Sequence, residues 1–353
     1  IERVFSNLYH GLRYHGCRVV LILNEVGFRP ALDWFGPDLE LHEIRPRRIW
    51  HRVSGLRATL RAVRPDVLLS AQHFANEVAC LAGRSCRVPV VVSEHTTLSR
   101  DLCSYGPLSP RRLIPWIDRR VYRHAAAVVA VSDGVARDFA ATTRIPHQRI
   151  RTIFNPVLPV GWSIQGVTGP LHAWLAERAA PTLVAMGRLE PVKDYPTLLR
   201  ALAHEDLAHV RLVIFGIGPQ RPSLLALSAD LQITQRVVLA GFTDAPIAQI
   251  RAADAFVLTS RWEGLPTVLV EALAARSPVV ATDCQSGPRE VLAGGRYGSL
   301  VPVGDVDALR RAIVAQLRSP LPPAPDDWID RFRAEQVAAQ YLALIRSAAT
   351  PRN

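Results

Sequence analysis

The sequence EGLPTVLVE occupies residues 263–271, between two short apolar runs at 255–259 and 278–281. Each run has the length and composition of a buried strand, and the pattern from 267 to 276 is helical. Pro266 stands where a helix favours its first residue. The order strand, turn, helix, strand therefore places this segment at the carboxyl end of a strand, where open parallel α/β sheets bind their ligands.

Two carboxylates bracket this segment, Glu263 in the turn and Glu271 in the helix. Because Glu271 lies in a run of Val, Leu and Ala, we expect it on a largely buried helix, where a carboxylate needs partners. The spacing also fits a loop Glu followed by a surface Glu on the outer face of the helix.

Composition limits the class of protein. The chain has 353 residues, 49% of them hydrophobic, and a mean hydropathy of +0.11, which suits two packed domains. No apolar run approaches the roughly 18 residues of a membrane span. The five scattered cysteines show no CxxC or Cys/His ligand spacing, which favours a reducing cytoplasm and argues against a disulfide framework or a structural zinc.

The positive charge is concentrated in the amino-terminal half. Residues 1–160 have a net charge of +10 and the remainder +1, within a total of +11. This imbalance favours an anionic partner such as a phospholipid surface, a lipid pyrophosphate or nucleic acid. Basic runs with interleaved stacking aromatics are absent, so nucleic acid is the weakest of these. A genome that uses Arg in place of Lys on solvated faces explains the preference for Arg but not the imbalance.

Apolar runs alternate with helical patterns along the whole chain, which predicts parallel βαβ units. In the first half we expect strands at 17–23, 66–69, 88–92 and 127–131, and helices at 2–14, 49–63, 74–82, 111–122 and from about 132. In the second half we expect strands at 182–186, 211–215, 237–240, 255–259 and 278–281, and helices at 267–276, 305–317 and 328–347. Residues 154–181, with several Pro and Gly, have the pattern of a linker.

We therefore predict two Rossmann-like domains, residues 1–160 and 161–330, followed by a carboxyl-terminal helix and tail at 331–353. A doubly wound domain normally opens with a strand and a Gly-rich turn. No strand precedes the helix at 2–14, so the first strand of the first domain is expected to be missing. On that expectation the sheet of the first domain is one strand short, and the wall that its first strand and Gly-rich turn would form is open.

Charged residues and glycines follow the strand ends of the second half. GRLEPVKDY, after the strand 182–186, contains Gly187, Arg188 and Lys193, the only lysine among 42 basic residues. Arg and Lys together suit a diphosphate, one as a planar fork and one as a compact charge, although two solvated turn residues would look the same. Gly216 and Gly218 follow the next strand as a close-turn pair.

Taken in order, these motifs resemble the retaining glycosyltransferases of family 4, which have the GT-B fold. The resemblance rests on GRLEPVKDY, FGIGP, AGF at 240–242, TSRWEGLPTVLVEALAA and ATDCQSGPREVL, with Glu263 and Glu271 at the E-x7-E spacing. It implies an α/β protein with two Rossmann-like domains facing across a cleft and a carboxyl-terminal helix returning to the first. The segment SGPRE at 286–290 resembles the bacterial transferases that add hexose or N-acetylhexosamine to surface glycans.

The resemblance implies roles for individual residues. Donor binding falls to Gly187, Arg188, Lys193, Gly216, Gly241, Phe242, Glu263, Gly264, Leu265, Pro266, Thr267, Val268 and Glu271, and catalytic roles to His95, Glu263, Arg188 and Lys193. Arg188 and Lys193 would neutralise the leaving diphosphate. Glu271 would accept the ribose hydroxyls, Glu263 would bind the donor sugar, and the amides after Pro266 would face the phosphate.

Two histidines follow strand ends in the first half. His95, in SEHTT, matches a family histidine that faces the donor sugar, although a structural or capping histidine is the plain alternative. His73, in SAQHFAN, is assigned to the acceptor side. Asp305 and Asp307 form a D-x-D pattern, but they follow Gly304 and open a helix, so helix capping explains them better than a metal site.

We therefore expect a metal-independent retaining transferase with a nucleotide-sugar donor, UDP favoured, and a glycan or polyprenyl-pyrophosphate-linked acceptor. It would be cytoplasmic and peripheral at the inner face of a bacterial cytoplasmic membrane, bound through the basic amino-terminal half. A GT-B sugar-nucleotide epimerase is one alternative, for which only Glu94 is well placed as an acid or base. A truncated, inactive sugar-nucleotide-binding module is another.

Overall fold

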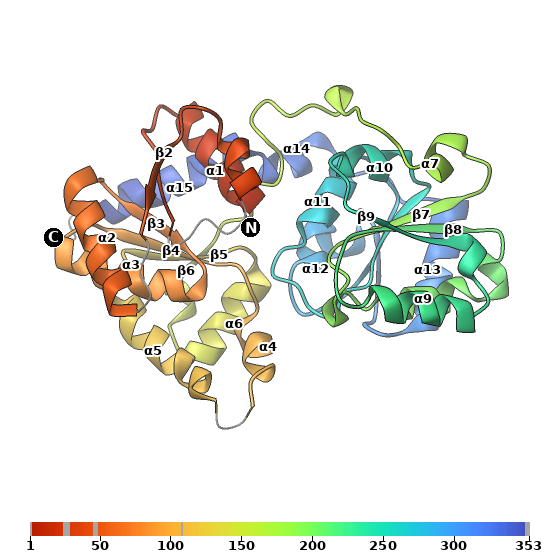
Figure 1. Ribbon diagram of the computed structural model, residues 1–353, viewed down its shortest axis with the longest axis horizontal. Coiled ribbons are helices and arrows are strands. Elements are labelled where there is room, and N and C mark those ends of the chain that lie inside the picture. The colour runs from red at the N-terminus through yellow and green to blue at the C-terminus, as the bar shows by residue number, and fades with distance from the viewer. Residues whose placement is uncertain (1, 24–28, 45–48, 107–108, 350–353) are drawn as a thin grey trace. The chain divides into compact units, whose positions relative to one another are not determined.

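The computed structural model describes residues 2–23, 29–44, 49–106 and 109–349, which fall into two compact units. The first unit consists of Ile1–Gly161 and Arg331–Asn353, and the second is Trp162–Asp330. Both are layered α/β structures with parallel sheets, so the predicted fold class is confirmed (Figure 1).

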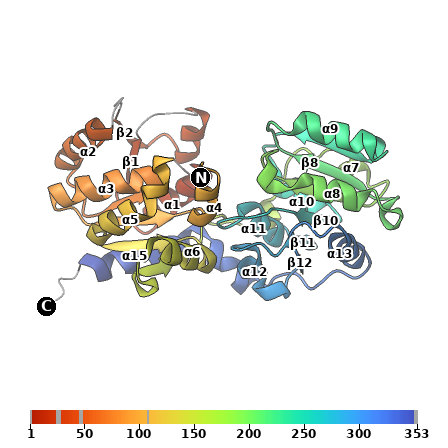
Figure 2. The same cartoon turned by 90° about the horizontal axis from the view of Figure 1, so that it is seen from below.

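The first unit contains a four-stranded parallel sheet in the order β3-β4-β5-β6 and a parallel pair β1-β2. Its strands are β1 (Val20–Leu23), β2 (Glu40–Glu43), β3 (Leu68–Ala71), β4 (Val90–Glu94), β5 (Ala127–Ala130) and β6 (Ile150–Thr152). Its α-helices are α1 (Glu2–Tyr14), α2 (Ile49–Val63), α3 (His73–Cys86), α4 (Leu98–Cys103), α5 (Ile114–Val121), α6 (Asp133–Thr143) and α15 (Ala334–Ala349). Helix α2 packs beside α3 (Figure 2).

The carboxyl-terminal helix α15 packs against α1 and so belongs to the first unit (Figure 1). Gly11 permits this close approach, because a Cβ there would lie 2.3 Å from the carbonyl oxygen of Ala334. Leu8 of α1 and Val337 of α15 share one buried core with Val91 of β4. Helix α15 therefore completes the hydrophobic core against which α1 packs.

The prediction of one continuous helix over 328–347 is wrong. The structure has α14 (Asp326–Ile329), a 3₁₀ turn at Asp330–Phe332, and then α15. The amides of Val157 and Leu158 donate to the carbonyl oxygen of Phe332, at 2.9 and 3.1 Å. Because this backbone pairs with another segment, and the Phe332 side chain is fully buried, the helix breaks here.

The second unit is built on a six-stranded parallel sheet in the order β12-β11-β10-β7-β8-β9. Its strands are β7 (Thr182–Met186), β8 (Arg211–Phe215), β9 (Val237–Gly241), β10 (Ala255–Leu258), β11 (Val279–Thr282) and β12 (Ser299–Val301). Its other α-helices are α7 (Ala173–Glu177), α8 (Tyr195–Leu202), α9 (Arg221–Asp230), α10 (Pro246–Ala252), α11 (Thr267–Ala274), α12 (Pro288–Val291) and α13 (Val306–Arg318). Helices α9 and α13 cover one face of the sheet, and α10 and α11 the other (Figure 1).

Residues 162–181, predicted as part of a linker, belong to the second unit and include α7. The Gln249 side chain holds this segment, accepting from the amide of His172 at 3.0 Å and donating to the carbonyl oxygen of Pro170 at 2.8 Å. Arg251 Nη1 also donates to the carbonyl oxygen of Ile164 at 3.0 Å, so side chains of α10 hold a stretch that has no apolar periodicity of its own.

Candidate donor site

The strand order of the second unit reverses between β7 and β10. Strand β8 pairs with one side of β7, and β10 pairs with the other side, with Ala255 opposite Leu183. In an open parallel sheet this reversal separates the loops that follow the two strands and leaves room for a ligand at their carboxyl ends. Lys193 lies in the segment after β7, and Glu263 in the segment after β10.

Lys193 and Glu263 form an ion pair at this switch point. The Lys193 Nζ lies 2.5 Å from Glu263 Oε1, and the two side chains are only 17% and 13% exposed. The hydroxyl of Ser260 donates to the same carboxylate oxygen at 2.6 Å. The hydroxyl of Thr259 donates to the main-chain carbonyl of Lys193 at 2.7 Å. The two loops are thus joined by charge and by hydrogen bonds, and an ammonium and a carboxylate are held side by side.

Glycines let the neighbouring turns pack closely around this pair. A Cβ on Gly187, whose φ is +150°, would lie 3.2 Å from Lys193 Cε, and a Cβ on Gly216 would lie 1.9 Å from the carbonyl oxygen of Gly187. Gly216 also donates its amide to the carbonyl oxygen of Gly241 at 2.7 Å. The loops after β7, β8 and β9 therefore meet backbone to backbone. Phe242, next in the chain, is 73% exposed.

Arg188 lies apart from the Lys193–Glu263 pair in the described part of the chain. Its side chain is 74% exposed, and its Nη1 pairs with Glu190 at 2.8 Å. The structure therefore places one of the two predicted diphosphate cations in the buried pair and the other on the surface of the same loop. The shared role of Arg188 and Lys193 at a diphosphate stays a prediction.

Helix α11 begins at Thr267, and Pro266 is its N-cap rather than its first residue as predicted. The Pro266 carbonyl accepts from the amides of Leu269 and Val270, at 3.0 and 3.4 Å. The amides of Thr267 and Val268 have no acceptor within the helix by their position. This end of the helix is therefore suited to an anion.

Ser286 and Gly287 support the turn before α11, a function that the sequence pattern did not reveal. The Ser286 hydroxyl donates to the main-chain carbonyl of Glu263. A Cβ on Gly287 would lie 2.4 Å from Pro266 Cδ and 3.0 Å from the Gly264 carbonyl oxygen. The SGPRE segment therefore fixes the backbone of the turn that contains Glu263. Leu265, in the same turn, is buried at 6% exposure.

Glu271 is buried in α11, with a relative exposure of 4%. The expectation of a carboxylate on the buried part of this helix is confirmed, and the alternative of a surface Glu is wrong. A carboxylate in such a place must be compensated by hydrogen bonds or charge. The contact with ribose hydroxyls stays a prediction.

In the first unit, His95 directly follows β4. Its Nε2 is buried, without a hydrogen-bond partner among the described residues, and its ring lies 5.7 Å from that of Phe5. Burial lowers the pKa of His95 from 6.5 to about 4. The imidazole is therefore neutral near pH 7, able to donate or accept a hydrogen bond but not to supply a positive charge.

This depressed pKa predicts an acid-sensitive fold. The neutral imidazole contributes fully to stability above pH 6.5, and the contribution is lost as the pH falls toward 4, because the unfolded chain takes up the proton more readily. Between pH 7.5 and 4.5 this effect amounts to about 2–3 kcal/mol. In urea unfolding, we expect the free energy of unfolding of His95→Gln to fall by about 2–3 kcal/mol less than that of the wild type over this interval. His147→Gln, at an exposed position, is the matched control and should lose as much stability as the wild type does. Equal acid sensitivity of His95→Gln and wild type would contradict the assignment.

Two other residues of the first unit face its interior. Glu94, at the end of β4, is 3% exposed and accepts hydrogen bonds from Asn76 Nδ2 at 2.9 Å and from the hydroxyl of Tyr122. His73, the first residue of α3, has its Nε2 3.2 Å from Asp118 Oδ2. The acceptor-side role of His73 stays a prediction, and Glu94 is engaged by its neighbours rather than presented as an acid or base.

The D-x-D pattern at Asp305–Asp307 caps a helix. The Asp305 side chain accepts from the Ala308 amide at 2.8 Å, as expected for the N-cap of α13. Asp307 pairs with Arg310 at 3.6 Å. The expectation of capping is confirmed.

Across the residues that the structure describes, no helix combines the length and apolarity that crossing a membrane requires.

The amino-acid sequence is similar to those of bacterial glycosyltransferases. The chain is 32% identical over 213 residues to the lipopolysaccharide core biosynthesis glycosyltransferase LpsE of Rhizobium meliloti, covering 55% of this chain and 62% of that protein. It is 33% identical over 135 residues to the N-acetylgalactosamine-N,N'-diacetylbacillosaminyl-diphospho-undecaprenol 4-alpha-N-acetylgalactosaminyltransferase of Campylobacter jejuni, covering 38% of this chain and 37% of that protein. The matches thus span less than two thirds of either relative.

The fold is shared with Alr3699/HepE of Anabaena, solved with UDP and glucose. The TM-score is 0.78 at 21% identity, over 98% of this chain and 96% of that one. Two family models match in succession, "Glycosyltransferase Family 4" over residues 1–159 and "Glycosyl transferases group 1" over residues 174–334. With both halves matched and the donor-side motifs gathered at one switch point, the chain belongs to the glycosyltransferases of family 4, with the GT-B fold.

Proposed function

We propose that this chain is a retaining, metal-independent transferase that moves a hexose or N-acetylhexosamine from a nucleotide sugar to a glycan or polyprenyl-pyrophosphate-linked acceptor. The observation that carries the proposal is the Lys193–Glu263 pair, 2.5 Å apart at the switch point of the second sheet. An ammonium there suits a diphosphate, and an adjacent carboxylate suits sugar hydroxyls. The two relatives named above, both enzymes of bacterial glycan assembly by name, support the acceptor class.

In the proposed reaction, the bond between the anomeric carbon and the diphosphate oxygen breaks as the acceptor oxygen bonds to the same face of that carbon. The acceptor's proton passes to the departing diphosphate oxygen. Lys193, Arg188 and the first amides of α11 stabilise the negative charge that develops there, and these groups take the place of a metal ion. Glu271 holds the ribose, and neutral His95 acts on the donor sugar as a hydrogen-bonding group.

A panel of nucleotide sugars tests the proposal. The protein is incubated with UDP-, GDP- and dTDP-hexoses and UDP-N-acetylhexosamines plus a polyprenyl-diphosphate-linked glycan, without added Mg²⁺ or Mn²⁺. We expect release of UDP with formation of an α-anomeric product, since UDP and glucose occupy the Anabaena neighbour. An inverted product, or turnover only after Mg²⁺ addition, overturns the retaining or the metal-independent part. Interconversion of free sugar nucleotides supports the epimerase instead, and nucleotide binding without turnover supports the inactive module.

We also propose that the first unit binds an anionic membrane surface through α5. The exposed side of this helix and the turn before it present Leu113 and Trp116, 59% and 58% exposed, beside Arg119 and Arg120. The guanidinium of Arg120 lies 4.2 Å from the centre of the Trp116 ring. Aromatic and basic side chains on one helix face suit the boundary between lipid headgroups and acyl chains. The net charge of +10 in residues 1–160 is complementary to anionic lipids.

Vesicle sedimentation tests this surface. We expect Trp116→Ala to weaken binding to vesicles containing anionic phospholipid by about tenfold or more, because an interfacial Trp is lost. Arg119→Gln with Arg120→Gln should weaken it further, at about 1 kcal/mol per charge. Trp34→Ala is the matched control, since Trp34 is 44% exposed elsewhere in the unit. Equal binding to neutral vesicles, or equal losses in Trp34→Ala and Trp116→Ala, would contradict the proposal.

A further inference from the structure

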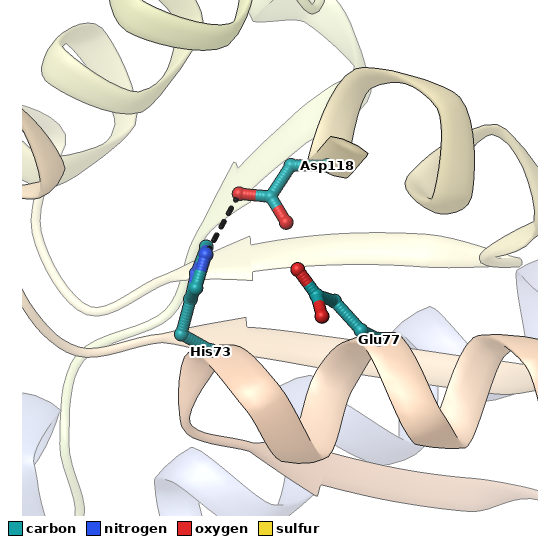
Figure 3. A group of neighbouring side chains, drawn as sticks. All are labelled: His73, Glu77 and Asp118. Carbon is teal, nitrogen blue, oxygen red and sulfur yellow. Dashed lines mark ion pairs between the residues drawn. The ribbon is translucent and has the colours of Figure 1, made fainter. Parts of the chain in front are cut away.

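Three side chains that could bind a metal ion converge between α3 and α5 of the first unit. His73 and Glu77 lie one turn apart on α3, and Asp118 faces them from α5 (Figure 3). One ligand atom from each lies within 4.8 Å of the others, and His73 Nε2 is 3.2 Å from Asp118 Oδ2. The cluster thus offers one nitrogen and two carboxylate oxygens as ligands for a single ion.

The central carboxylate lacks the hydrogen bonds that a buried group normally has. Asp118 is 0% exposed, and neither of its side-chain oxygens has a hydrogen-bond partner among the described residues. His73 Nε2 likewise has none there, although it is within ion-pair distance of Asp118. Glu77 is also buried, at 9% exposure, so two carboxyl groups share this enclosed space. A cation would compensate both.

A second layer of side chains orients the histidine. His73 Nδ1 lies 4.0 Å from Glu94 Oε2, at ion-pair distance, and the other ring nitrogen, Nε2, lies 3.2 Å from Asp118 Oδ2. Glu94 is itself held by Asn76 Nδ2 at 2.9 Å. A carboxylate behind a histidine is the arrangement by which proteins orient a metal-binding imidazole.

We propose that His73, Glu77 and Asp118 form a Zn²⁺ site that ties α3 to α5, with water in the fourth position. One imidazole and two carboxylates suit zinc, whereas Mg²⁺ prefers oxygen ligands and retains several waters. The 2+ charge balances the two carboxylates. The cysteine spacing gave no sign of this site, because no cysteine belongs to it. The ion has no part in the transfer chemistry proposed above.

Zinc titration of the whole chain tests the site without requiring turnover. The protein is dialysed against a chelator, freed of it, and titrated with Zn²⁺ in competition with a chromophoric chelator. We expect one tight equivalent per chain, weakened about 100-fold or more in His73→Gln and Asp118→Asn. The matched controls His147→Gln and Asp66→Asn, at exposed positions of the same unit, should bind as wild type does. Glu94→Gln should weaken binding by about 10–100-fold, as expected for a group that orients a ligand.

Thermal unfolding separates a metal site from a merely structural network. At a Zn²⁺ concentration about 100-fold above Kd, the wild type should melt about 5–10 °C higher than the zinc-free protein. Asp118→Asn should lose this rise while its zinc-free melting temperature stays unchanged or increases, since a crowded carboxyl group has been removed. That result also shows that the variant folds.

Several outcomes overturn the proposal. These are the absence of a tight equivalent in the wild type, a zinc-induced rise retained in Asp118→Asn, and equal losses in His73→Gln and His147→Gln. Stabilisation by Mg²⁺ but not by Zn²⁺ also overturns it.

Discussion

Lys193→Ala is expected to lower the rate of sugar transfer by about 100-fold or more. The side chain belongs to the chain's only lysine, and it lies largely buried beside Glu263 rather than in solvent. A charge that meets the leaving diphosphate stabilises the transition state more than the ground state, so its loss lowers kcat. The variant also leaves the Glu263 carboxylate without the cation 2.5 Å away.

The measurement is nucleotide diphosphate release under saturating donor, with unfolding by urea to show that the fold is intact. Arg200→Ala removes an exposed cation from α8 of the same unit and should turn over as the wild type does. Because Lys193 and Glu263 act as a unit, Lys193→Ala combined with Glu263→Gln should cost little more than either change alone. Wild-type turnover in Lys193→Ala would remove the central residue of the proposed mechanism.

Glu263→Gln and Glu271→Gln are expected to separate transfer from nucleotide binding. Glu271→Gln should weaken binding of UDP alone by about 10–100-fold, since charge-assisted hydrogen bonds contribute about 1.5–3 kcal/mol. Glu263→Gln should leave UDP affinity within about twofold of wild type and lower transfer by about 100-fold, because its predicted contacts are to the sugar. Calorimetric titration with UDP, followed by a transfer assay, measures both.

The matched control for these variants is Glu205→Gln, an exposed carboxylate elsewhere in the second unit. It should change neither quantity. Equal losses of UDP affinity in Glu263→Gln and Glu271→Gln would show that the two carboxylates do not divide the donor between them as proposed.

Two core strands of the second unit were predicted to the residue, and three others to within one residue at each end. Strands Thr182–Met186 and Arg211–Phe215 have the predicted bounds, because a buried parallel strand is a short run of apolar residues in any context. Strands β2, β6 and β12 were not predicted. Each has only three or four residues, and β2, with the sequence ELHE, has no apolar alternation. Such strands form because a neighbour offers hydrogen bonds, which local sequence does not show.

The sequence by itself determined the fold class, the family motifs and the candidate donor residues, because the spacing of apolar residues and the residue types of turns are local properties. Only the tertiary structure decided which of those residues meet. It joined Lys193 to Glu263, which are 70 positions apart, and left Arg188 paired with Glu190 at the surface. It also buried Asp118, which stands among arginines in RLIPWIDRR, opposite His73. Sheet order and helix packing set these distances, and both arise from contacts between distant segments that residue spacing does not encode.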